Sequence, residues 1–200
     1  MNLPNKLTIF RIILVPIFIL LSYLEIPGEI FGISNTLIIM DIIFVVASIT
    51  DTLDGYIARK RNLVTNFGKF LDPIADKILV VSALVVFVEY GKIPAWIPLI
   101  VITREFLVSG YRLIAVQSRG KVIPANIWGK MKTVTQMISI ALIFIDKYNF
   151  LDFISEAESM GIGYMIFNII TSVLLIFSII ATIFSGWSYL KEGKDLLKDY

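Results

Sequence analysis

The sequence has neither cysteine nor histidine among its 200 residues, and charged residues make up only 17% of it. Without those two side chains the chain lacks the usual protein ligands of zinc and copper, so any bound metal ion must be held by oxygen atoms. We find no internal repeat and no low-complexity tract. The net charge of +2 gives no reason to expect a nucleic-acid partner.

Hydrophobic residues dominate instead, at 57% of the chain, and the mean hydropathy is +0.83. This composition predicts an integral membrane protein. A membrane-spanning helix needs about 20 mostly apolar residues. Six runs have this length, and they cover roughly residues 7–25, 35–57, 71–90, 95–117, 127–146 and 162–190. The predicted fold class is therefore an all-α membrane protein in which residues 1–200 form one domain of six transmembrane helices.

Basic residues between the runs predict the orientation, because loops rich in lysine and arginine stay in the cytoplasm. One side of the predicted membrane carries only Lys92 and Lys147. The other side carries Lys6, Lys60, Arg61, Lys69, Arg119, Lys121, Lys191, Lys194 and Lys198. We therefore expect a multi-pass protein of the cytoplasmic membrane with both termini in the cytoplasm. Its basic side favours contact with anionic membrane lipids or phosphorylated substrates.

Four aspartates lie where a membrane protein tolerates charge least. Asp51 and Asp54 end the second run, and Asp72 and Asp76 begin the third. A carboxylate at membrane depth costs about 3 kcal/mol, so four of them require a cationic partner. Residues three or four apart share one face of a helix, and a short turn between the two helices would bring both pairs together. Mg²⁺ and Mn²⁺ prefer oxygen ligands, and four carboxylates suffice for two ions.

Small residues and one arginine stand between the two aspartate pairs. Gly55, Ala58 and Gly68 leave room for a ligand to approach the backbone. Arg59, at the cytoplasmic end of its helix, can bind a diphosphate through two parallel hydrogen bonds. These residues predict a nucleotide site, although Gly55 and Ala58 could instead be close-packing positions between membrane helices.

The whole segment reads D-x2-D-G-x2-A-R-x8-G-x3-D-x3-D, which resembles the signature of the CDP-alcohol phosphotransferase family. Every fixed position is matched, by Asp51, Asp54, Gly55, Ala58, Arg59, Gly68, Asp72 and Asp76. The resemblance implies that the four aspartates bind two divalent ions and that Asp76 is also the catalytic base on the acceptor hydroxyl. The implied CDP-lipid site comprises Asp54, Gly55, Ala58, Arg59, Gly68, Asn5 and Thr8. The family also implies a homodimer and an active site that faces the cytoplasm.

Basic residues of the fourth and fifth runs bear on the second substrate. Arg104 and Arg112 are eight residues apart, a rotation of about 80° around a helix, so both can lean toward one cavity. The predicted acceptor-phosphate site comprises Arg104, Arg112, Arg119, Lys130 and Lys132. Two stretches resemble the branch of the family that transfers the phosphatidyl group of CDP-diacylglycerol to sn-glycerol 3-phosphate: T103-R104-E105 with Arg112, and G129-K130-M-K132-T133-x-x-Q136. The opening L3-P4-N5-x-L7-T8-x-x-R11 resembles that branch too. The expected partners are those two substrates and the surrounding membrane lipids.

Other functions fit parts of this pattern. The same chemistry could use another acceptor, such as inositol phosphate or serine. A small cation transporter would also bury acidic residues, but it would place them near mid-span on several helices rather than at one end of a helical hairpin. A membrane prenyltransferase would show two separate aspartate-rich motifs, and this sequence has one contiguous block.

Several residues also have a purely structural interpretation. Arg104 could pair with Glu105 or Asp41, and the lysines of the fifth run could reach the membrane surface. Asp41, outside the motif, is expected to bind a neighbouring helix rather than a ligand. Four aromatic residues near predicted span ends are interpreted as interface anchors: Trp96, Trp128, Trp187 and Tyr189.

Overall fold

The computed structural model describes residues 3–60, 66–119 and 126–193, with the side chains of all of these except 3–4, 52–59, 66–70, 72–73, 113, 115–119 and 192–193. Six long helices occupy these ranges: α1 (Leu3–Ser22), α2 (Asn35–Lys60), α3 (Asn66–Glu89), α4 (Trp96–Arg119), α5 (Ile127–Ile145) and α7 (Ile162–Gly193). A short helix, α6 (Asp152–Ser155), and a hairpin of two-residue strands, β1 (Glu29–Ile30) and β2 (Ile33–Ser34), complete the described structure.

Each long helix overlaps one of the six predicted apolar runs. The largest difference is at α3, which begins at Asn66 rather than near residue 71. The hairpin and α6 were not predicted. The hairpin reverses the chain through two residues in the left-handed region, Phe31 (φ 54°) and Gly32 (φ 77°). Strands of two residues are too short to produce an alternating pattern in the sequence.

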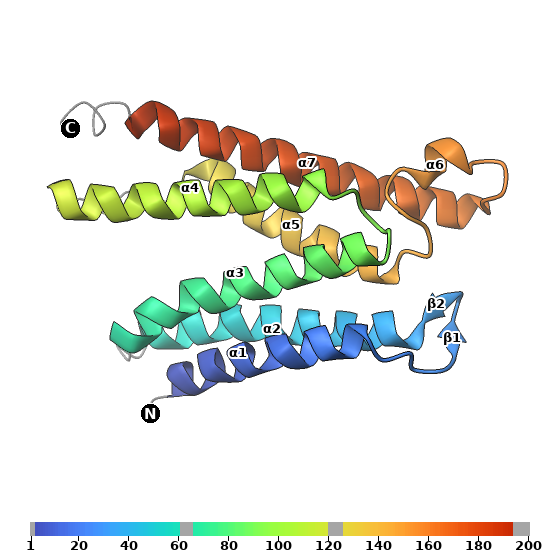
Figure 1. Ribbon diagram of the computed structural model, residues 1–200, viewed down its shortest axis with the longest axis horizontal. Helices are drawn as coiled ribbons and strands as arrows, with labels where there is room; N and C mark the ends of the chain where they lie inside the picture. The colour runs from blue at the N-terminus through green and yellow to red at the C-terminus, as the bar shows by residue number, and fades with distance from the viewer. Residues whose placement is uncertain (1–2, 61–65, 120–125, 194–200) are drawn as a thin grey trace.

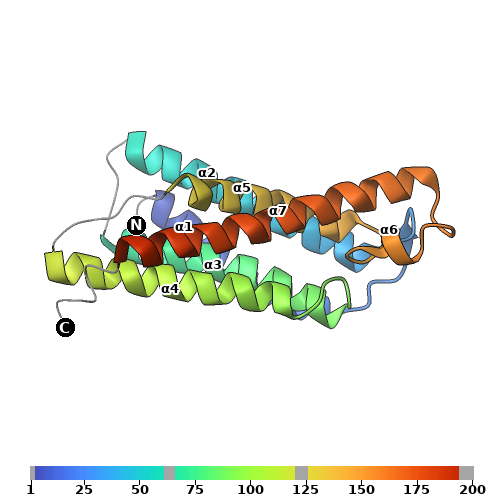
Figure 2. The same cartoon turned by 90° about the horizontal axis from the view of Figure 1, so that it is seen from above.

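The six long helices run up and down along the long axis of an elongated bundle (Figure 1). α1 begins and α7 ends at one end of the bundle, where α2 and α4 also end and α3 and α5 begin (Figures 1 and 2). The hairpin and α6 lie at the opposite end. α5 packs most extensively on α7, while α1 packs on both α2 and α3. This order brings the first turns of α3 and α5 to the same end as the last turns of α4.

An aromatic cluster joins four helices in the half of the bundle that carries the hairpin. Phe144 of α5 lies between Phe18 of α1, Phe44 of α2 and Phe87 of α3, with ring centroids 5.9, 6.1 and 4.4 Å away. All four side chains are buried. Edge-to-face and tilted ring pairs stabilise beyond the area they bury. The cluster therefore holds α1, α2 and α3 against α5.

A lysine in the turn after α3 connects the same end of the bundle. Lys92 Nζ donates to the carbonyl oxygens of Asp146, Lys147 and Tyr148, at 2.5, 3.2 and 3.4 Å. A cation just past the end of α5 also interacts favourably with the negative end of that helix. Burial lowers the pKa of Lys92, and the nearby carboxylates of Asp146 and Asp152 oppose this shift.

The outer surface of the bundle is apolar. Exposed large side chains include Leu20 of α1 (65%), Phe106 of α4 (76%) and Ile162 of α7 (79%). In the part of the chain that the structure describes, two stretches are long and apolar enough to cross a membrane: Asn5–Ser22 and Ile162–Lys191. Fewer than half of the residues in either stretch are buried, whereas a helix in a soluble core buries most of its apolar surface. The structure is mostly helical and consistent with an all-α membrane protein.

We expect Phe144→Ala to lower the free energy of unfolding by about 3–5 kcal/mol, because it removes the ring shared by three aromatic contacts and leaves a cavity. Reversible unfolding of the purified protein in detergent micelles, followed by circular dichroism, measures the change. Phe106→Ala is the matched control, since Phe106 is 76% exposed. That control should change the free energy by no more than about 0.5 kcal/mol. Equal losses in the two variants would contradict the role assigned to the cluster.

Candidate active site

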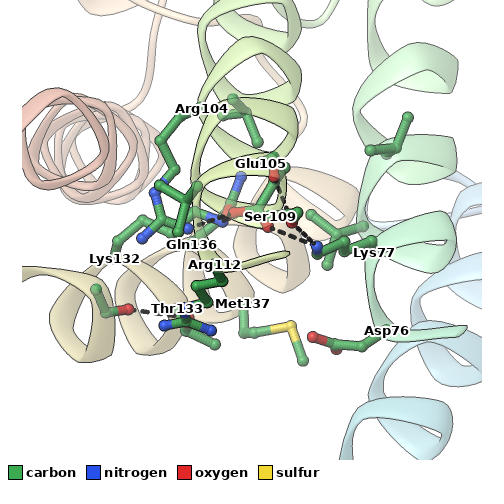
Figure 3. Close-up of a pocket in the computed structure, with 15 residues that line it drawn as sticks. Asp76, Lys77, Arg104, Glu105, Ser109, Arg112, Lys132, Thr133, Gln136 and Met137 are labelled. Atoms are coloured by element: carbon green, nitrogen blue, oxygen red, sulfur yellow. Dashed lines mark hydrogen bonds and ion pairs between the residues drawn. The ribbon is translucent and has the colours of Figure 1, made fainter. Parts of the chain in front are cut away.

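A cavity of about 260 Å³ lies between α3, α4 and α5, in the half of the bundle where α3 and α5 begin (Figure 3). Its lining residues recur three or four positions apart in each helix, so each helix turns one face toward it. Polar residues at this spacing within apolar helices are the sequence signal for such a face. The charged members are Asp76 and Lys77 of α3, Arg104, Glu105 and Arg112 of α4, and Lys132 of α5.

Glu105 lies at the centre of the charged network. Its Oε1 accepts hydrogen bonds from Arg104 Nη1 and from Lys132 Nζ, both at 2.8 Å. Its Oε2 lies 3.7 Å from Lys77 Nζ, and Lys77 also donates to Ser109 Oγ (Figure 3). One carboxylate thus joins cations from α3, α4 and α5.

The cavity carries more positive than negative charge. Four basic and two acidic side chains line it, which leaves an excess of two positive charges. Lys132 is 6% exposed, so its ammonium group is largely shielded from water. Basic groups that converge in a partly desolvated pocket bind anions such as phosphate or carboxylate through charge-assisted hydrogen bonds. A dianionic phosphate would match the excess charge.

The last turns of α7 contact the two arginines of the cavity. Arg112 Nη2 donates to the hydroxyl of Tyr189 at 2.6 Å, and its guanidinium carbon lies 5.3 Å from the centroid of the same ring. Tyr189 is 3% exposed, so its prediction as an interface anchor is wrong. It is buried because α7 packs along α4 at this level. Trp187, by contrast, is 67% exposed on the outer face of α7.

The structure brings three of the five predicted acceptor-site residues into the cavity: Arg104, Arg112 and Lys132. Lys130 is exposed and does not line it, since neighbouring positions differ by about 100° around a helix. The side chain of Arg119 lies outside the described residues. Arg104 does form the pair with Glu105 that the structural interpretation anticipated, but that pair itself lines the cavity.

Several lining residues were not among the predicted site residues. Apart from the apolar residues and Met137, they are Lys77, Glu105, Ser109, Gly129, Thr133 and Gln136. Glu105, Gly129, Thr133 and Gln136 fall within stretches that the sequence already related to the second substrate. Lys77 is one position after Asp76, a rotation of about 100°, so the spacing of polar residues did not indicate it. Asp41 has one buried oxygen, Oδ1, without a hydrogen-bond partner among the described side chains. The interhelical partner that the sequence led us to expect does not bind this oxygen.

Two of the four motif aspartates have described side chains. Asp76 lines the cavity, and Asp51 forms an ion pair with the buried Arg11 of α1. The charges that act on Asp76 include those of Asp51, Arg11 and Lys132, so the carboxylates of α2 and α3 share one electrostatic environment. Within the described side chains no group of three metal-ligating residues is present. The side chains of Asp54, Gly55, Ala58, Arg59, Gly68 and Asp72 lie outside the described residues.

The oxygen chemistry of this region fits Mg²⁺ or Mn²⁺. Asp51 lies in the second half of α2 and Asp76 in the first half of α3. Asp54 follows Asp51, and Asp72 precedes Asp76, by about one turn on the same helices. These cations prefer carboxylate oxygens. The chain therefore offers two acidic pairs from two adjoining helices.

The opening of α1 contributes a buried polar face next to Asp51. Asn5, Thr8 and Arg11 are 8%, 1% and 1% exposed. They are three residues apart, so they share one face of the helix. The two residues predicted for the CDP-lipid site, Asn5 and Thr8, thus lie on the same inward face as the cation that binds Asp51.

An apolar groove of about 410 Å³ adjoins the cavity between α3 and α4. Ile74, Ile78, Ile102 and Phe106 line it, and Lys77, Val81, Glu105 and Ser109 line both the groove and the cavity. Ile78 and Phe106 are exposed on the outer surface of the bundle. A charged cavity and an outward-facing apolar groove therefore share one wall.

Known proteins resemble this chain over nearly its full length. The sequence model of the CDP-alcohol phosphatidyltransferase family matches residues 1–184. A protein of Bacillus subtilis (strain 168) is 39% identical over 98% of this chain and 97% of its own. A protein of Haemophilus influenzae is 39% identical over 99% and 96%, and one of Rickettsia typhi is 38% identical over 96% and 97%. All three are named CDP-diacylglycerol–glycerol-3-phosphate 3-phosphatidyltransferase.

The family description agrees with the resemblance in the aspartate motif, and the match includes both that motif and the helices around the charged cavity. The chain belongs to the CDP-alcohol phosphatidyltransferase family.

Proposed function

We propose that the protein transfers the phosphatidyl group of CDP-diacylglycerol to sn-glycerol 3-phosphate, which yields phosphatidylglycerophosphate and CMP. The observation that carries this proposal is the cavity that holds Asp76 together with Arg104, Arg112 and Lys132. It combines a carboxylate of the family motif with a cationic site that suits a phosphorylated acceptor. The names of the full-length relatives support the same pair of substrates.

The acceptor phosphate would bind among the cations of α3, α4 and α5. Lys132 and Arg104 already converge on one oxygen of Glu105, and Lys77 approaches its other oxygen. A bound phosphate offers further acceptor oxygens to the remaining N–H groups of these side chains. The three glycerol carbons would then extend from the phosphate toward Asp76 at the α3 side of the cavity (Figure 3).

In the proposed reaction the 1-hydroxyl oxygen of the acceptor attacks the phosphorus next to diacylglycerol. A new phosphorus–oxygen bond forms while the bond to CMP breaks, and CMP leaves with the bonding electrons. Asp76 takes the hydroxyl proton as general base. Arg59 would stabilise the charge on the departing CMP.

Asp51, Asp54, Asp72 and Asp76 would hold two Mg²⁺ or Mn²⁺ ions. When bound, such ions neutralise the carboxylates and offset the charge that develops on the diphosphate. The proposed CDP-lipid site adds Gly55, Ala58, Arg59 and Gly68 with Asn5 and Thr8. The buried inward face of α1 supports the assignment of the last two.

We further propose six membrane-spanning helices in a single domain, with both termini and the active site toward the cytoplasm. The exposed apolar side chains of the long helices support this topology. So does the common end of the bundle where α1 begins and α7 ends (Figure 1). The apolar groove between α3 and α4 would receive the acyl chains from the side. The homodimer expected from the resemblance is part of the same proposal.

Asp76→Asn should reduce CMP release by about 100-fold or more, because the variant has no general base for the acceptor proton. The assay uses protein purified in detergent with CDP-diacylglycerol and Mg²⁺, with and without sn-glycerol 3-phosphate. Circular dichroism and gel filtration establish that the variant keeps the parent fold. Release by the parent with only a different alcohol would refute the proposed acceptor. A folded Asp76→Asn variant with parental activity would refute the proposed base.

Removal of divalent metal should abolish CMP release. EDTA followed by gel filtration is expected to leave the protein folded but inactive, because four unneutralised carboxylates repel the diphosphate. Addition of Mg²⁺ or Mn²⁺ should restore the rate. Full activity of the metal-free protein would contradict the proposed ion site.

Lys132→Met should raise the KM for sn-glycerol 3-phosphate by about 10-fold or more, since a buried hydrogen bond to a charged group contributes roughly 1.5–3 kcal/mol. Lys130→Met serves as the contrast on the same helix, because Lys130 is exposed and outside the cavity lining. Its KM should change much less. A larger effect at Lys130 than at Lys132 would place the acceptor outside the cavity.

A further inference from the structure

The guanidinium group of Arg104 forms hydrogen bonds through both of its terminal nitrogens. Its Nη1 donates to Glu105 within the cavity at 2.8 Å, and its Nη2 donates to Ser185 Oγ of α7. Ser185 is completely buried. The two ends of the guanidinium fork are therefore bound to different helices.

Ser185 is itself oriented by the start of α5. Its hydroxyl donates to Asn126 Oδ1 at 3.4 Å, which leaves the lone pairs of the serine oxygen toward the guanidinium. Asn126 Oδ1 also accepts from the backbone N–H of Gly129 at 2.7 Å, and this bond caps α5. A chain of hydrogen bonds thus runs from the cap of α5 through α7 to Arg104 on α4.

Gly129 leaves the space that this arrangement needs. A Cβ at this position would lie 3.0 Å from Asn126 Oδ1, 3.3 Å from Arg104 Nη2 and 3.4 Å from Ser185 Oγ. The first two distances are tighter than ordinary contacts between such atoms. A side chain at residue 129 would therefore push the guanidinium or the cap away from its present position.

We infer that Ser185, oriented by Asn126, is a positioning residue that sets Arg104 for the acceptor phosphate. The inference rests on the proposed function, in which Arg104 binds that phosphate. An arginine recognises an oxyanion through a planar fork, so the direction of the plane matters as much as the charge. Because Ser185 already holds Arg104 Nη2, the guanidinium plane does not have to be ordered when the acceptor binds.

Ser185→Ala should raise the KM for sn-glycerol 3-phosphate by about tenfold, the effect of one hydrogen bond to a charged group. The KM for CDP-diacylglycerol and the kcat should stay close to those of the parent. The full-length protein in detergent micelles is assayed by CMP release with each substrate varied in turn. A general loss of packing would affect the KM values of both substrates, so a rise in the KM for sn-glycerol 3-phosphate alone indicates a positioning role.

Two control variants lie on the same helices as Ser185 and Arg104, namely Ser188→Ala on α7 and Gly110→Ala on α4. Ser188→Ala removes a partly exposed hydroxyl of α7 that donates to the carbonyl of Phe184 within its own helix, at 3.0 Å, and should leave both KM values unchanged. Gly129→Ala should reproduce the rise in the KM for sn-glycerol 3-phosphate, because its methyl group displaces the fork from the other side. Gly110→Ala on α4 should not, since nothing lies within 4 Å of its added Cβ.

An unchanged KM for sn-glycerol 3-phosphate in Ser185→Ala would overturn the inference, and so would an equal rise in both KM values. If Ser185→Ala does not fold, the comparison of Gly129→Ala with Gly110→Ala decides in the same way. A folded parent that releases no CMP from these two substrates would overturn the proposed function instead. The two failures are therefore distinguishable.

Discussion

The carboxylate of Glu105 is the interaction on which the polar half of this bundle depends. It holds Arg104 and Lys132 on one oxygen and lies near Lys77 with the other, so it joins α3, α4 and α5. Without an anion among them, three cations in a partly buried cavity would repel one another and separate. With it, the cavity is assembled before any substrate arrives and still keeps an excess of positive charge. A phosphate that enters shares these cations with Glu105 rather than meeting them unpaired.

The two halves of the molecule are built from different chemistry. Phe144 and its three aromatic neighbours, with Lys92 bound to the carbonyls beyond α5, hold the half that carries the hairpin. The charged side chains of the cavity occupy the other half. Apolar packing thus supplies a rigid frame at a distance from the site. The polar residues near the site then need to contribute less to the stability of the fold and can serve substrate binding.

Much of the fold could be predicted from the sequence because the signals are local. A run of about 20 apolar residues predicts a helix without knowledge of its neighbours, and each of the six runs corresponds to a long helix. Tyr189 shows where this reasoning ends: its position near a run end resembled that of an interface anchor. Its burial against Arg112 depends on the packing of α7 along α4, which no local pattern encodes. The hairpin was missed because its strands are only two residues long.

The site residues also divide into those that local sequence signals predict and those that depend on packing between helices. Arg104, Arg112 and Lys132 were predicted to converge and do line one cavity, whereas Lys130 does not, because its rotation about α5 turns it outward. Lys77 and Ser185 interact with partners on other helices, so the sequence alone gave no indication that they belong to the site. The aspartate motif is recognisable from spacing, and two of its four aspartates, Asp51 and Asp76, have described side chains.

The wall shared by the charged cavity and the apolar groove has a consequence for how two unlike substrates could meet. A lipid that lies in the groove would keep its acyl chains in the bilayer while its head reaches across Lys77 and Ser109 into the cavity. The water-soluble acceptor of the proposed reaction has no acyl chains to keep in the bilayer, so it does not need the groove. Encounter with the lipid would then depend on its density in the plane of the membrane, and encounter with the acceptor on its concentration in the aqueous phase.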